Sequence, residues 1–165
     1  MSTRIAIVLL TMLGCVGCDQ ATKAIARARL PLGQTISLLG DTLRLERTTN
    51  PGGFLSLGEA LPRGARVTAF TAGGALLVLV ALLWAFRSRR VTPLQVFGAA
   101  LICGGGLGNV IDRVMYAGHV TDFLNLGIGA RRTGIFNVAD MALMAGLALV
   151  VLGAGERHPR SQRNG

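Results

Sequence analysis

The chain has 165 residues, of which 51% are apolar and 15% are charged, and its formal net charge is +9. This balance excludes a mostly soluble protein and is typical of a chain that crosses a membrane several times. The positive charge comes from sixteen Arg and one Lys spread between apolar runs rather than gathered in one patch with aromatic residues, so nucleic acid is not an expected partner.

The first apolar run, residues 5–18, is "IAIVLLTMLGCVGC". After Arg4, and with a small residue before each of Cys15 and Cys18, it has the pattern of a lipoprotein signal peptide whose cysteine receives lipid. Its 14 residues fall short of the roughly 20 that a membrane-spanning helix needs, so it spans only by including the charges that follow. Because three further apolar runs follow it, we expect a permanent membrane helix over residues 5–24. A lipidated lipoprotein is the alternative, and an intact mass with an unmodified N-terminal segment would exclude it.

The stretch after this run is expected to form a polar cap outside the cytoplasm, over residues 27–64. "QTISLLGDTLRLERTTN" alternates apolar and polar residues around Gly40 and Asp41, which predicts a short β-hairpin. "NPGGFLSLG", residues 50–58, combines a turn with apolar residues and predicts a loop that lies in the membrane interface.

Three more apolar segments predict three more membrane helices. They are expected over residues 67–86, 94–113 and 135–154, and the last contains a single charge, Asp140. The glycines and paired arginines of residues 114–134 predict an irregular loop on the same side as the cap. The whole chain, 1–165, is interpreted as one domain.

Orientation is predicted from positive charge, which concentrates on the cytoplasmic side of membrane proteins. The connector "RSRRVTP" and the C-terminal "ERHPRSQRNG" are dense in Arg. We therefore expect both termini in the cytoplasm.

Ionisable residues at apolar spans are costly and therefore candidates for function. Asp19 and Lys23 are four residues apart and are expected to pair on one helical face. Asn109, Asp112 and Arg113 also share a face and predict a polar site at the outer end of the third span. Charges that only fix helix packing remain the alternative for both groups.

Asp122 and Asp140 form the sharper pair. Asp122 is placed in the loop after the third span, and Asp140 in the first turns of the fourth, three residues after Asn137. Both are expected at the same membrane boundary. Two adjacent carboxyls do not both ionise easily, and they supply one base and one acid for amide hydrolysis without a covalent intermediate. The alternative is two unrelated polar residues at an interface.

Other chemistries fit less well. His119 and Asp122 have helical spacing, but the other histidine, His158, lies in the opposite tail, so no zinc site is expected. No cofactor is expected, because "GGGLG" lacks the spacing of a phosphate-binding loop. Gly104 and Gly108 are interpreted instead as positions where two helices approach closely.

Five motifs in order along the chain resemble those of the bacterial lipoprotein signal peptidases (signal peptidase II). They are "DQATK", "NPGG", "GNVIDR", "HVTDF" and "FNVAD". The resemblance implies a four-helix membrane bundle with a small β-cradle and an amphipathic interfacial loop, in the bacterial inner membrane with the active site at its outer face. It also implies a monomeric aspartic endopeptidase without a cofactor, which contacts membrane lipid and cleaves diacylglyceryl-modified prolipoproteins before the lipidated cysteine.

The resemblance also implies the site residues. Asp122 and Asp140 correspond to the family's catalytic pair, and Asp112 is given a structural role. The residues expected to line and support the substrate site are Asp19, Lys23, Asn50, Gly52, Asn109, Arg113 and Asn137.

The outer loop departs from the family's usual N-x-G-A-A-F-S, because "NPGGFLSLG" has Phe54 one position early. A second hypothesis is a small proton- or solute-coupled transporter, in which Asp19, Lys23, Asp112 and Asp140 form a relay. Uptake driven by a pH gradient would support that hypothesis.

Overall fold

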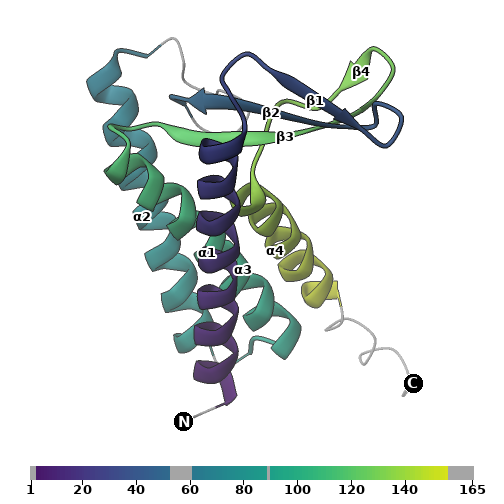
Figure 1. The fold of residues 1–165 in the computed structure, drawn as a ribbon. Coiled ribbons are helices and arrows are strands. Elements are labelled where there is room, and N and C mark those ends of the chain that lie inside the picture. The colour runs from purple at the N-terminus through teal and green to yellow at the C-terminus, as the bar shows by residue number, and fades with distance from the viewer. Residues whose placement is uncertain (1–2, 53–60, 89, 156–165) are drawn as a thin grey trace.

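A computed structural model describes residues 3–52, 61–88 and 90–155 of the protein. Its helices form an elongated bundle with a small sheet across one end (Figure 1). In chain order the elements are α1 Thr3–Arg29, β1 Thr35–Leu38, β2 Leu43–Asn50, α2 Arg63–Arg87, α3 Pro93–Met115, β3 Val120–Ile128, β4 Arg131–Arg132 and α4 Val138–Gly155.

Within this described part, four helices are each long and apolar enough to cross a membrane. The side chains on the outside of the bundle are also apolar, as α2 illustrates, where Leu76 is 60% exposed and Leu79 is 51% exposed. Large apolar surfaces of this kind are stable against lipid and not against water. The predicted fold class, a four-helix membrane bundle with a small sheet, is confirmed.

Local sequence explains where α3 begins. Thr92 accepts a hydrogen bond from the backbone N–H of Gln95, and the Gln95 side chain accepts one from the backbone N–H of Thr92. Pro93 occupies the first helical position, where its missing N–H costs nothing. α3 therefore starts at a defined residue and runs through the middle of the bundle, in contact with α1, α2 and α4.

The close contact between α1 and α3 depends on glycine. A Cβ added at Gly104 would lie 2.7 Å from the Cβ of Cys15, and Met12 is also adjacent. The expectation that small residues of the third span allow close helix approach is confirmed.

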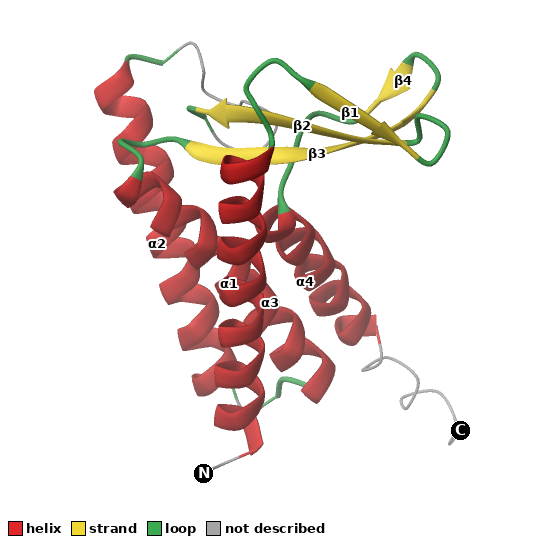
Figure 2. Ribbon diagram, viewed as in Figure 1, coloured by secondary structure: helices red, strands yellow, loops and turns green. Residues whose placement is uncertain are grey.

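The sheet is antiparallel, with strand order β1-β2-β3-β4, and lies over the end of the bundle where α1 ends and α4 begins (Figure 2). The predicted hairpin is confirmed, because β1 pairs with β2 from Thr35 opposite Glu46 to Leu38 opposite Leu43. β2 pairs with β3, with Thr48 opposite Asp122. Asp122 is therefore held in the sheet.

The prediction of an irregular loop over residues 114–134 was wrong, and so was the placement of Asp122 in it. This segment contains β3 and β4. β3 is buried on both faces from Val120 to Phe123, so it lacks the alternation of apolar and polar residues that marks a strand with one exposed face. The chain turns at the two ends of β3, at Gly118 and Gly129, which both have positive φ.

The predicted interfacial loop lies mostly outside the described residues, which stop at Gly52 and resume at Leu61.

Candidate active site

A buried cluster of charges joins α1 to α3 just below the sheet. The Nζ of Lys23 lies 2.8 Å from Asp19 and 3.3 Å from Asp112, and it donates a hydrogen bond of 2.9 Å to Oδ1 of Asn109. Both ion pairs are fully buried. The predicted pairing of Asp19 with Lys23 on one helical face is observed, and it extends to α3.

Asp19 also reaches α4. Its Oδ1 accepts a hydrogen bond of 2.9 Å from the backbone N–H of Ala139, one of the first residues of α4. N–H groups at a helix start have no partner within the helix and favour a negative charge. Gly108 makes room for this carboxylate, since an added Cβ there would lie 2.6 Å from its Oδ2.

Asp140 and Asn137 form a reciprocal cap at the start of α4. The backbone N–H of Asn137 donates to Oδ2 of Asp140 at 3.2 Å, and the backbone N–H of Asp140 donates to Oδ1 of Asn137 at 3.0 Å. The amide of Asn109 donates to the other oxygen of Asp140 at 3.0 Å. This arrangement is a capping box, which fixes both the helix start and the direction of the carboxyl.

Asp122 is held from two sides. The amide of Asn50, at the end of β2, donates to its Oδ2 at 2.9 Å, and the amide of Asn137 donates to its Oδ1 at 2.6 Å. Asp122 is 1% exposed and Asp140 is 8% exposed. Asn137 thus bonds to both carboxyls, which come from different elements, β3 and α4.

The surroundings of Asp122 change its protonation. Burial first, and the charge of Asp140 second, raise the pKa of Asp122 to about 7, against the lowering effect of its hydrogen bonds from Asn50 and Asn137. A carboxyl with this pKa carries a proton for much of the time near neutral pH. The pair therefore has the composition of an acid and a base working together.

Arg113 connects this site to the end of β2. Its Nη2 donates to the carbonyl of Gly52 at 2.8 Å, and the N–H of Gly52 donates to Oδ1 of Asn50 at 2.9 Å. Its guanidinium also lies 5.8 Å from the centre of the Phe70 ring. Arg113 thereby fixes the turn that carries one of the partners of Asp122.

All the predicted site residues within the structure gather at this end of the bundle, and two contributors were missed. Gln20 donates to Asp112 at 3.1 Å and to the carbonyl of Gly108 at 3.1 Å. The backbone N–H of Thr121 donates to Asp112 at 3.0 Å. Gln20 could have been predicted, because it stands next to Asp19 in the "DQATK" motif. The contact of Thr121 could not, because it is made by a backbone N–H that nearly every residue type has.

No group of three or more His, Cys, Asp or Glu side chains placed to hold a metal ion occurs within residues 3–52, 61–88 and 90–155.

Comparison with known proteins gives concordant results. Residues 11–154 match the family model described as signal peptidase (SPase) II. A protein named lipoprotein signal peptidase from Mycobacterium tuberculosis is 35% identical over 90% of this chain and 67% of its own length. Another of that name, from Desulforapulum autotrophicum, is 34% identical over 82% of this chain and 83% of its own.

Solved structures show the same fold. A bacterial membrane enzyme solved by the in meso method at 2.3 Å resolution superposes with a TM-score of 0.84, at 23% identity, over 98% of this chain and 94% of the other. Taken with the family match and the sequence relatives, this establishes that the chain belongs to the signal peptidase II family.

Proposed function

We propose that this protein removes the signal peptide from diacylglyceryl-modified prolipoproteins, cutting before the lipidated cysteine, with Asp122 and Asp140 as its catalytic pair. The peptidase activity follows from the family and from relatives named lipoprotein signal peptidase. The observation that carries the assignment of the pair is the bridge through Asn137, which bonds to both carboxyls.

The proposed reaction needs one proton shared between the two carboxyls. The ionised member takes a proton from water, and the resulting hydroxide attacks the carbonyl carbon of the scissile peptide. The protonated member donates to the carbonyl oxygen, giving a tetrahedral diol. Collapse of the diol breaks the C–N bond, and the leaving amine takes up a proton from the pair.

The neighbouring residues act as positioning groups in this proposal. Lys23 and Asp19 are fully buried and contact α3 and α4, so their support of the site runs through the helices that they join. Asn109 links them to Asp140, because it accepts from Lys23 and donates to Asp140. Holding both carboxyls in place before substrate arrives removes reorganisation from the reaction.

We place the protein in the bacterial inner membrane with both termini in the cytoplasm and the aspartate pair at the outer face. α1 begins and α4 ends at the end of the bundle away from the sheet (Figure 1). Arg4 donates to the carbonyl of Ser88 at 2.9 Å, so this end also carries the arginine-dense connector between α2 and α3. Concentrated positive charge favours the cytoplasmic side.

The polar residues of the alternative transporter relay gather in the sheet-side part of the bundle. Asp19, Lys23, Asp112 and Asp140 contact one another or shared neighbours there. A transport path needs polar groups across the whole depth of the membrane. This distribution supports the peptidase.

The test is a gel-shift assay with purified protein and a diacylglyceryl-modified prolipoprotein. Asp122→Asn and Asp140→Asn should each abolish cleavage while the thermal unfolding temperature stays near that of the wild type. Glu46→Gln, which removes a carboxylate on the neighbouring strand β2, is the matched control and should cleave normally. Substantial cleavage by either Asp variant would refute the assignment of the pair.

A further inference from the structure

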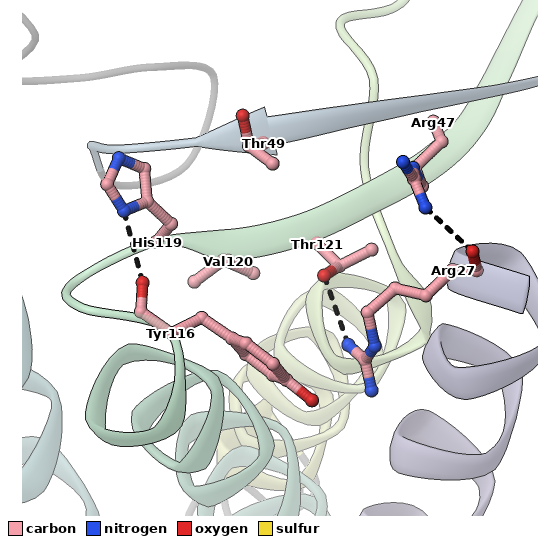
Figure 3. A pocket seen from close by; sticks show the side chains of 7 residues that line it. All are labelled: Arg27, Arg47, Thr49, Tyr116, His119, Val120 and Thr121. Carbon is pink, nitrogen blue, oxygen red and sulfur yellow. Dashed lines mark hydrogen bonds between the residues drawn. The ribbon is translucent and has the colours of Figure 1, made fainter. Parts of the chain in front are cut away.

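A second group of cations lies in a pocket between the sheet and the ends of α1 and α3. The pocket has a volume of about 400 Å³. Figure 3 shows the seven lining residues, which are Arg27, Arg47, Thr49, Tyr116, His119, Val120 and Thr121. Thr121 precedes Asp122 on β3, and because successive side chains of a strand point to opposite faces, the Thr121 side chain lies on the face of the strand away from the Asp122 carboxyl.

Arg27 is fixed at the floor of the pocket. Its Nη1 donates to the hydroxyl of Thr121 at 3.1 Å, and its guanidinium lies 4.6 Å from the centre of the Tyr116 ring. The Oδ1 of Asp112 lies 4.0 Å from the same Nη1, and Asp112 already belongs to the ion cluster of Lys23. The direction of the guanidinium is therefore set before any ligand arrives.

Arg47 closes the other side and has unused donor capacity. Its Nη1 donates to the backbone carbonyl of Arg27 at 2.7 Å, which anchors the side chain to the end of α1 (Figure 3). Its Nε is buried and has no hydrogen-bond partner in the part of the chain that the structure describes. The Nη–H groups of arginine donate charge-assisted hydrogen bonds to the oxygens of a phosphate.

The charge of the region favours an anion. None of the seven lining residues is acidic. Below the pocket, Lys23 faces the carboxylates of Asp19 and Asp112. Together with Arg27 and Arg47, Lys23 makes three positive charges against these two negative ones, so one positive charge is left uncompensated. Thr49, which is exposed on β2, lines the rim.

The location identifies the kind of anion. α1 ends two residues after Arg27, and α3 ends one residue before Tyr116. The ends of membrane-spanning helices lie at the depth of lipid headgroups, where Tyr is enriched. Val114 and Met115, which precede Tyr116, are 71% and 64% exposed, so the last turn of α3 offers apolar surface to lipid chains.

We propose that this pocket binds the phosphate group of one membrane phospholipid, held between the guanidinium groups of Arg27 and Arg47. Arginine side chains bind phosphate oxygens in this way, through charge-assisted hydrogen bonds. The bound phosphate contacts the guanidinium groups of Arg27 and Arg47 and stabilises the junction of α1, β2 and β3. The proposal needs the membrane placement of the helices but not the peptidase reaction.

The test measures lipid binding directly, by native mass spectrometry of delipidated protein titrated with phosphatidylglycerol. We expect one tightly retained lipid per protein. Arg47→Gln should weaken its binding by at least about tenfold, because it removes charge-assisted hydrogen bonds. Arg29→Gln is the matched control, since it removes an exposed arginine from the same end of α1 outside the pocket, and it should bind as the wild type does.

A second variant keeps the test valid if Arg47→Gln folds poorly. Thr49 is exposed on β2, so Thr49→Glu leaves the bond from Arg47 to α1 intact and places a carboxylate at the rim of the pocket. It should abolish tight lipid retention with the thermal unfolding temperature of the delipidated protein unchanged. Retention unchanged in Thr49→Glu, or lost equally in Arg29→Gln, would overturn the proposal.

Two further ligands identify the source of the phosphate. Diacylglycerol with the same acyl chains lacks the phosphate and should not be retained in the same way. Inorganic phosphate lacks the chains and should not displace the phospholipid at comparable concentration. Equal binding of diacylglycerol would refute the role of the phosphate, and equal binding of inorganic phosphate would refute the lipid as the ligand.

Discussion

Replacing Lys23 by Met tests the buried charge cluster most directly. Lys23 contacts Asp19, Asp112 and Asn109 through one ammonium group, and both ion pairs are fully buried. Met keeps most of the side-chain volume, so the change removes the charge without opening a large cavity. Two carboxylates then remain buried, and Arg27 lies 4.0 Å from Asp112. Removing one partner of a buried ion pair costs about 3–5 kcal/mol of unfolding free energy.

The measurement is SDS-induced unfolding in mixed micelles, followed by the fluorescence of Trp84, the single tryptophan of the chain. Arg29→Gln, an exposed change on the same helix, should alter the unfolding free energy by less than about 0.5 kcal/mol. Adding Asp112→Asn to Lys23→Met should recover part of the loss, because one excess buried charge disappears. A loss below about 1 kcal/mol for Lys23→Met, or no recovery in the double variant, would refute an electrostatic role for the cluster.

Three further outcomes are expected. Because burial and the charge of Asp140 raise the pKa of Asp122 to about 7 and the proposed reaction needs one proton on the pair, kcat/KM should fall about tenfold per pH unit above that value; a flat alkaline limb would contradict this. Gly108→Ala should lower the unfolding free energy by about 1–3 kcal/mol through contact with the carboxylate beneath it, whereas Gly14→Ala, with open space around it, should not lower it in the same micelle assay. Arg113→Gln should raise KM more than it lowers kcat in steady-state cleavage, since Arg113 holds the turn after β2 rather than the reacting groups. A lower kcat with an unchanged KM would exclude this role.

The membrane helices were predictable from composition because their pattern is local. Uncharged runs of sufficient length mark each helix, and the i,i+4 spacing of Asp19 and Lys23 predicts their pairing without knowledge of the fold. The hairpin was also predictable, since β1 and β2 alternate around a turn with positive φ at Gly40.

The position of Asp122 in a strand was not predictable in this way. Its strand is buried on both faces, and its partner, β2, lies more than seventy residues earlier in the sequence. The link from Asp19 to the N–H of Ala139 is equally hidden, because it joins residues that are 120 positions apart through a backbone group. Spacing identified the two aspartates as neighbours at one boundary, while only the fold shows that Asn137 connects them.

The cap that α1 supplies to α4 has a consequence for biogenesis. α1 is synthesised first and α4 last, yet a free N–H at the start of α4 is satisfied by Asp19 of α1. Until the two helices meet, that donor and the carboxylate of Asp19 both lack this partner in an environment that penalises exposed polar groups. The aspartate pair is completed by the same event, because Asp140 lies one residue further along the same helical turn. A nascent chain therefore lacks the proposed catalytic pair until α4 has docked against α1.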